Sequence, residues 1–289
     1  MDTTIIDAPA FKAGMRAQWD TAAAGWNAHT PDIRAWLRTP TETMCRMAGV
    51  AAGSRVLDVA AGAGDQTLHI AGRVGPQGHV LATDLSPAIV ALARDNARRA
   101  GFGQVEVRVA DGEDLRVAEA GFDAAVCRLG LMFFPDPQRG LREMFRALRP
   151  GGGLCTMVFS GPERNPCLAI LMSTALKHAG LPPRDPFGAG GLLSLGRPGH
   201  IDALFRSAGF DDVATTAFDA VFRLPKVDDY LAFVRSSASP ILQILGRLDA
   251  AAAELAWAEM RERLLAFTTP RGWEGPNELL LTAGRRPGG

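Results

Sequence analysis

The middle of the chain alternates short apolar runs with stretches of helical periodicity. In 105–109, three valines alternate with charged residues, a pattern typical of a strand with one buried face. Ser86 and Pro87 are typical of a helix N-cap and a first helical position. The runs that predict strands in this part are 55–60, 79–84, 105–109, 122–127 and 154–159. Strands separated by helical stretches imply parallel βαβ units, so we expect a doubly wound α/β fold.

After residue 159 the pattern loosens. A helical stripe in 141–148 stops at 149–153, where proline and three glycines predict a turn before the fifth strand. Further helices are expected in 167–179, 199–208, 227–248 and 251–266, and further strands in 213–222 and 278–283. The chain therefore predicts a mostly parallel, seven-stranded, Rossmann-like sheet with a mainly helical cap.

This pattern divides the chain into parts of the sheet and parts of the cap. The expected parts are an N-terminal helical cap segment in 1–50, the core in 51–160, a cap insertion in 161–198, a core helix and strand in 199–222, a helical cap insertion in 223–276 and the final core strand in 277–289. The Gly/Pro-rich stretch 181–199 is either a moving lid or a surface connection.

Composition excludes several classes of protein. The 289 residues carry 31 basic and 31 acidic side chains, so nothing in the net charge favours nucleic acid. No apolar stretch approaches the ~20 residues of a membrane helix, and the first residues lack the basic and apolar segments of a secretory leader. The four cysteines, at 45, 127, 155 and 167, show neither C-x-x-C spacing nor a nearby histidine pair. We therefore expect no metal site and a reducing, cytoplasmic location.

The run from Val56 to Gly64 leads from a strand through small residues into a helix. In doubly wound sheets ligands bind at the carboxyl ends of the strands, and such a turn lets the backbone approach them closely. A dinucleotide site would need a third small residue, but Gly62 and Gly64 are followed by Asp65 and Thr67. An acid there would also lie unfavourably beside a diphosphate. A ligand without phosphate is favoured, with a dinucleotide as the alternative.

Acidic residues and glycines recur after successive strands. Asp58 and the glycine turn belong to the first, Asp84 ends the second, and the remaining motifs are Asp111-Gly112-Glu113 after the third and Leu148 to Gly152 before the fifth. In this order and spacing, the series in 55–159 resembles that of class I S-adenosylmethionine-dependent methyltransferases. Within that superfamily it is most similar to the ubiquinone/menaquinone-biosynthesis branch and its small-molecule methyltransferase relatives.

The resemblance implies how these residues would bind S-adenosylmethionine. Asp84, followed by Leu85, would accept hydrogen bonds from the ribose hydroxyls; the alternative is a favourable charge at a helix N-terminus. Asp58 would pair with the ligand ammonium, directly or through water, or with nearby backbone N–H groups, since an unpaired buried carboxylate is costly. The other residues would line the methionine portion (Ala60, Gly62 and Gly64) or hold the adenine edge (Asp111, Gly112 and Glu113).

Side chains that follow the fourth strand are further candidates. Arg128 either binds a carboxylate of cofactor or substrate, or pairs with Asp136 as a structural brace. Leu131, Met132 and Phe133 come next and either face a substrate or belong to the core.

The N-terminal segment and the histidines supply the last candidates. Trp19 and Trp26 are seven residues apart and would share one helix face, either beside the sulfonium through cation–π attraction or as anchors to the core. His29 and His178 are candidates for a general base, and Tyr230 is the only tyrosine. The sequence does not assign the base.

We therefore expect an S-adenosylmethionine-dependent methyltransferase that moves a methyl group to an O, N or C nucleophile. Its substrate would be a small, partly apolar organic molecule, similar to a quinol, a phenol or a secondary metabolite. The alternatives are a dinucleotide-dependent oxidoreductase and a cofactor-binding regulator without turnover. The expected assembly is a monomer or a homodimer with no nucleic-acid partner.

Overall fold

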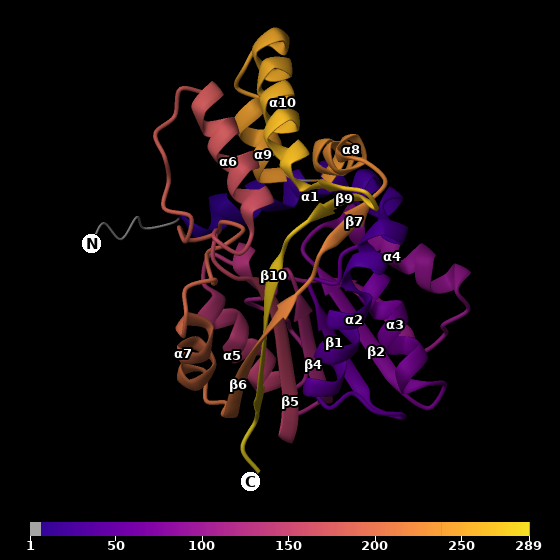
Figure 1. Cartoon of the computed structure of the whole chain (residues 1–289). Helices are drawn as coiled ribbons and strands as arrows, with labels where there is room; N and C mark the ends of the chain where they lie inside the picture. Colours follow the sequence, from indigo (N-terminus) through magenta and orange to yellow (C-terminus); the bar gives the residue numbers. More distant parts are fainter. Residues whose placement is uncertain (1–6, 238, 289) are drawn as a thin grey trace.

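A computed structural model describes residues 7–237 and 239–288 as a central sheet flanked by helices (Figure 1). The main sheet has seven strands in the order β3-β2-β1-β4-β5-β10-β6. Their bounds are β1 Arg55–Val59, β2 His79–Asp84, β3 Val105–Val109, β4 Phe122–Arg128, β5 Leu148–Phe159, β6 Asp211–Asp219 and β10 Glu278–Arg285. Neighbours among β1 to β5 pair in parallel, whereas β10 is antiparallel to both β5 and β6. The predicted doubly wound, mostly parallel sheet is confirmed.

Two groups of helices pack against this sheet. In the first group, α3 contacts α2 and α4, and these three helices contact strands among β1 to β5 and, for α2, also β10. In the second group, α5 and α7 contact each other and β5, β6 or β10. The bounds of these helices are α2 Thr30–Met47, α3 Asp65–Val74, α4 Pro87–Arg99, α5 Pro137–Ala147 and α7 His200–Ser207. Helix α4 begins as predicted, because the Ser86 hydroxyl accepts a hydrogen bond from the Ile89 N–H (3.1 Å).

The remaining helices gather beyond the upper end of the sheet in Figure 1. They are α1 Ala8–Ala28, α6 Pro166–His178, α8 Val227–Ser237, α9 Ser239–Leu245 and α10 Ala250–Leu264, with the 3₁₀ turns η1 Leu131–Phe133 and η2 Leu265–Phe267. Helix α1 contacts α8 and α9, and α6 contacts α9 and α10. No helix among the described residues is long and apolar enough to cross a membrane.

Four details differ from the sequence prediction. The strand expected in 213–222 is two strands, β6 and β7 (Phe222–Leu224), separated by Ala220 and Val221, and the Ala220 N–H still donates to the Asn277 carbonyl next to β10 (2.8 Å). Strand β7 pairs with β9 (Gly272–Gly275), which also pairs with β8 (Thr268–Thr269), so 223–276 carries a small sheet as well as helices.

The helix expected in 227–248 is also interrupted. Helix α8 ends at Ser237, and Pro240, which cannot continue a helix that precedes it, lies at the start of α9. The stretch 149–153, predicted as a turn before the fifth strand, does not form a separate turn. Strand β5 already begins at Leu148, and the extra residues are absorbed by a register shift against β4 between Phe122 and Ala124.

Candidate cofactor and substrate site

A cavity of about 190 Å³ lies where the strand order reverses between β1 and β4. This is the place where open α/β sheets bind ligands. Most of the predicted site residues line it, and they are Trp19, Trp26, Ala60, Gly62, Asp84, Leu85, Asp111, Gly112, Glu113, Arg128, Met132 and Phe133. Five predicted residues do not line it, namely Asp58, Gly64, Leu131, His29 and His178, and Leu131 is a fully buried core residue.

Asp84 faces this cavity from the tip of β2 and also holds the neighbouring backbone. Its Oδ2 accepts the Gly62 N–H (3.1 Å), and its Oδ1 accepts the Ser86 N–H (3.0 Å). Burial raises the pKa of Asp84, although these backbone N–H groups oppose the rise. The carboxylate thus fixes the glycine turn relative to β2 while it lines the cavity.

Asp58 lies behind the cavity wall. It is fully buried, and its carboxylate accepts hydrogen bonds from Gln66 Nε2 (2.5 Å) and Thr67 Oγ1 (2.6 Å). Burial raises the pKa of Asp58 to about 6, against the lowering effect of these two bonds and of Arg128. The predicted backbone N–H partners are wrong, because each carboxylate oxygen accepts from a side chain of α3, whereas the pairing with a ligand ammonium stays a prediction. Of the two α3 residues, Gln66 lines the cavity.

Gly64 has a packing role in this fold. It precedes α3 with φ +92°, and a Cβ there would stand 3.4 Å from the Cα of Ala93 in α4. The left-handed backbone favours a glycine here, and a Cβ would only just fit against α4. The prediction that it lines a ligand is not supported.

Lys12 joins two of the predicted carboxylates. Its Nζ lies 2.7 Å from Asp111 Oδ2 and 2.6 Å from Glu113 Oε2, and all three residues line the cavity. Burial lowers the pKa of Lys12, but its hydrogen bonds with the two carboxylates outweigh this and leave the pKa raised. Sequence analysis missed Lys12 because no local pattern links α1 with a loop about a hundred residues later in the chain.

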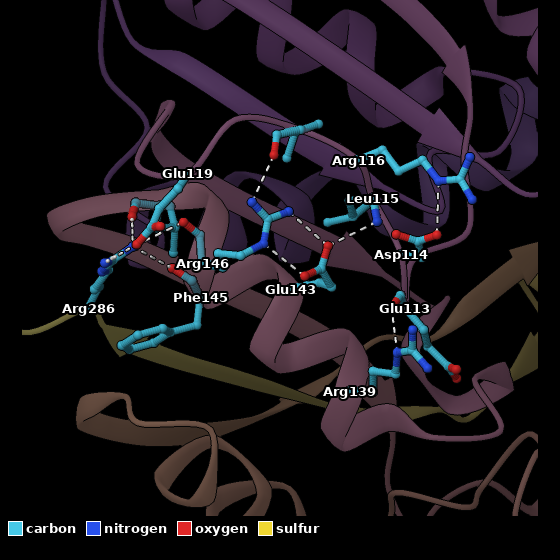
Figure 2. A network of polar contacts seen from close by, with 12 residues as sticks. Glu113, Asp114, Leu115, Arg116, Glu119, Arg139, Glu143, Phe145, Arg146 and Arg286 are labelled. Carbon is cyan, nitrogen blue, oxygen red and sulfur yellow. Dashed lines mark hydrogen bonds and ion pairs between the residues drawn. The ribbon is translucent and has the colours of Figure 1, made fainter.

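The loop that follows β3 is clamped onto α5 by a polar network (Figure 2). Arg139 Nε donates to the Glu113 carbonyl (2.8 Å), and Glu143 Oε2 accepts the Leu115 N–H (3.1 Å). Arg146 pairs with Glu143 and donates to the Val117 carbonyl (2.8 Å). These contacts hold Asp111 and Glu113 at the cavity from behind.

Arg128 has a partner that differs from the predicted one. Its guanidinium contacts Asp65 Oδ2 (3.1 Å) and Thr41 Oγ1 (2.9 Å), while Asp136 accepts the Arg139 N–H at the start of α5. The proposed brace with Asp136 is wrong. Asp65 also pairs with Arg34 (2.8 Å), so two arginines neutralise the acid that follows the glycine turn.

The tips of β1 and β4 adopt strained backbone conformations beside the cavity. Ala60 and Leu129 both lie in the left-handed region, with φ of +54° and +57°. This region is unfavourable for residues with a Cβ, and such strain concentrates at functional sites. Gly130 lies next to this pair, and a Cβ there would stand 2.3 Å from the Cβ of Ala60. The two strand tips therefore meet at a position that admits only one methyl group.

Aromatic rings form a large part of the cavity wall. The Trp19 ring lies edge-on to Trp26 (centroids 5.8 Å apart) and to Phe133 (5.7 Å), so the prediction that the two tryptophans share one face of α1 is confirmed. A second region of the cavity wall includes Trp36 and Phe222, whose rings stack with a centroid distance of 4.8 Å. The side chains of this region are almost all apolar, including Phe159, Leu171, Phe222, Phe233 and Ile241.

The two predicted base candidates lie outside the cavity wall. His29 follows α1, where Nδ1 lies 3.2 Å from Asp32 Oδ2 and the ring packs edge-on against Phe233. His178 ends α6 and contacts Glu259 of α10 through Nε2 (2.9 Å). Both imidazoles hold helices together, and neither is positioned to act on a ligand in this cavity.

A sheet of this order, with a glycine turn after β1 and carboxylates at the tips of β2 and β3, defines the class I S-adenosylmethionine-dependent methyltransferase fold. Residues 33–175 match a sequence model of the ubiE/COQ5 methyltransferase family. The resemblance predicted from the motif series is confirmed over this part of the chain. One similar protein with a related name is the ubiquinone/menaquinone biosynthesis C-methyltransferase UbiE of Ectopseudomonas mendocina, which is 37% identical to this chain over 142 residues.

That match covers 49% of this chain and 54% of the relative, so the chain spans about half the length of the curated relatives it matches. Solved structures extend the likeness of fold to most of the chain. The YcgJ protein of Bacillus subtilis has a TM-score of 0.60 at 21% identity, covering 87% of this chain and all of its own. The cyclase SpnF has a TM-score of 0.57 at 22% identity, covering 94% and 97%.

Proposed function

We propose that this protein is an S-adenosylmethionine-dependent methyltransferase that methylates a small, largely apolar molecule, with a carbon atom as the favoured acceptor. One observation carries the proposal: a single cavity connects the carboxylate-lined tips of β2 and β3 with a region walled by aromatic and aliphatic side chains. The names of the curated relatives, which are C-methyltransferases, support carbon over oxygen or nitrogen.

The residues at the strand tips fit this cofactor better than a dinucleotide. Asp84, Asp111 and Glu113 line one region of the cavity, where hydroxyl and amino groups would be bound and a diphosphate repelled. Gly62 has φ +57°, and a Cβ there would stand 3.2 Å from Trp26 Nε1, so the glycine allows both the left-handed backbone and the close approach of the indole to the turn that lines the cavity. These are the features expected around an adenosyl group joined to a sulfonium.

Bound S-adenosylmethionine would supply both the methyl group and its own leaving group. The chain's residues would therefore orient the reactants and exclude water, which can contribute several kcal/mol without a covalent catalyst. We propose that Asp84 accepts the ribose hydroxyls, that Asp111 and Glu113 with Lys12 hold the adenine end, and that the backbone at Ala60 and Gly62 contacts the methionine portion. Arg128, which lines the cavity, would bind the carboxylate.

The aromatic side chains would complete the site on the other side of the sulfonium. Trp19, Trp26 and Phe133 line the cavity and hold one another edge-on, which fits attraction of a positively charged sulfur and exclusion of water. Met132 would belong to the same apolar wall. A monomeric or dimeric state and a cytoplasmic location stay predictions; the buried, unpaired cysteines agree with the latter.

Titration calorimetry with S-adenosylhomocysteine tests the cofactor. We expect micromolar binding by the wild type and a loss of about 10- to 100-fold in Asp84→Asn, as for hydrogen bonds to a charged group. Asp123→Asn is a matched control, because this carboxylate pairs with Arg149 away from the cavity. No binding at high micromolar concentration, or tighter binding of a nicotinamide dinucleotide, would overturn the proposal.

Transfer of a labelled methyl group to a panel of quinols, phenols, amines and carboxylic acids tests the activity. We expect incorporation with quinols or phenols, and the position of the label on carbon or oxygen identifies the acceptor atom. Cofactor binding without transfer to any member of the panel would favour a binding protein without turnover. The fold alone does not decide this point, since folds host many functions.

A further inference from the structure

The apolar region of the cavity offers few polar groups to a substrate. Three of them are Ser237, Asn277 and Tyr230. The Ser237 hydroxyl donates to the Phe233 carbonyl, and Asn277 Nδ2 donates to the Gly275 carbonyl (3.1 Å). Among the described residues we find no hydrogen bond to the hydroxyl of Tyr230. Tyr230 thus brings a polar group to this wall that the fold itself does not use.

The ring of Tyr230 is held in place from two sides. It stacks on Trp273 with centroids 4.3 Å apart and planes 20° apart, and it lies edge-on to Phe222 at 5.9 Å. Trp273 is fully buried and is fixed in turn, because its indole N–H donates to the Leu264 carbonyl (2.9 Å). A ring packed in this way presents its hydroxyl in one direction, which is how a preorganised binding group is built.

The charged groups of the cavity lie elsewhere and already have partners. Lys12 pairs with Asp111 and Glu113, and Arg128 pairs with Asp65. Burial raises the pKa of Tyr230 well above its usual value, so the hydroxyl stays protonated near neutral pH and can donate. A phenolic or quinolic oxygen is the acceptor that such a donor suits.

We propose that the Tyr230 hydroxyl donates a hydrogen bond to an oxygen of the methyl acceptor and so determines which atom of that molecule faces the methyl donor. This inference rests on the proposed function and assigns a specificity-determining residue to the same site. In a region walled mainly by apolar side chains, a fixed donor selects against molecules without a matching acceptor, because the donor would be left unpaired.

Two probes of nearly equal shape isolate this contact: 1-naphthol, which carries the hydroxyl, and 1-methylnaphthalene, which carries a methyl group in its place. Equilibrium dialysis measures their binding to the protein saturated with S-adenosylhomocysteine. We expect the wild type to bind 1-naphthol about 3- to 10-fold more tightly than 1-methylnaphthalene, the range of one net hydrogen bond. In Tyr230→Phe this preference should disappear, while the affinity for 1-methylnaphthalene stays the same.

Ser237→Ala is the matched control, since it removes another hydroxyl of α8 that is already bonded within the protein. It should keep the preference for 1-naphthol. A preference that survives in Tyr230→Phe, or one lost equally in both variants, would overturn the inference. Failure of the proposed function is distinguishable, because then S-adenosylhomocysteine would not bind to the wild type either.

Discussion

The buried carboxylate of Asp58 makes the stability of this protein depend on pH in an unusual direction. Burial raises its pKa from 3.8 to about 6, so between these values the folded state binds more protons than the unfolded state. The contribution of Asp58 to the free energy of unfolding is therefore complete below about pH 4 and is lost as the pH rises through about 6. This direction is opposite to that of a carboxylate in a surface ion pair, whose contribution is lost in acid.

The magnitude follows from the difference of about two pKa units. At 1.36 kcal/mol per unit, ionisation of Asp58 costs the folded state about 3 kcal/mol above pH 7, of which about 2 kcal/mol develops between pH 4.5 and 7.5. Asp58→Asn removes this titration and keeps a side chain of the same shape. The difference in free energy of unfolding, variant minus wild type, should therefore increase by about 2 kcal/mol over that range.

Urea unfolding followed by tryptophan fluorescence at several pH values gives this difference directly, because all other titrating groups are shared by the two proteins. A second variant, Thr67→Val, removes one of the donors to Asp58 and should make the pH dependence steeper than in the wild type. A difference between Asp58→Asn and the wild type that stays constant from pH 4.5 to 7.5 would refute the reasoning.

Two further predictions concern residues that line or adjoin the cavity. Gly130→Ala should destabilise the protein by about 1–3 kcal/mol, since its Cβ would overlap that of Ala60. In a double variant that also carries Ala60→Gly, at least about 1 kcal/mol of this cost should be removed. A urea double-mutant cycle in which the two free energies are additive would contradict this prediction. Lys12→Met should cost about 1–3 kcal/mol, because the carboxylate of Glu113 is 3% exposed and would lose the cation with which it pairs. Lys12→Arg should retain much of the stability, and an unchanged urea midpoint for the methionine variant would show that the pair contributes nothing.

The sheet and its order of elements were accessible to sequence analysis because they depend on local patterns. Each of the first five strands contains a short apolar run or, in β3, an alternation of valines with charged residues, and Ser86 marks the start of α4 with a side chain that bonds its own helix. The small sheet was missed for the opposite reason. Strands β7, β8 and β9 have two to four residues each, too few to show a period, and they are stabilised by pairing with one another across the chain.

The candidate site also has some features that the sequence predicts and others that it does not. Glycine turns and carboxylates after strands are visible in the sequence, and Asp84 lines the cavity as expected. Which carboxylate faces inward could not be predicted: Asp58 turns to Gln66 and Thr67 because those residues happen to lie on the facing side of α3. Lys12 escaped notice because its partners are distant in sequence.

This division limits what the family resemblance can say about the substrate. The matched segment, residues 33–175, contains the strand tips with Asp84, Asp111 and Arg128, which line the cavity and which we propose to bind the cofactor. Phe222, Tyr230 and other residues of the apolar region lie after it, and Lys12 and the first two cavity tryptophans lie before it. Relatives that share the matched segment can therefore share a cofactor and still differ in acceptor. We therefore expect the segments around that core to contribute to the choice of acceptor, and the Tyr230 hydroxyl that we propose to bind the acceptor lies in one of them.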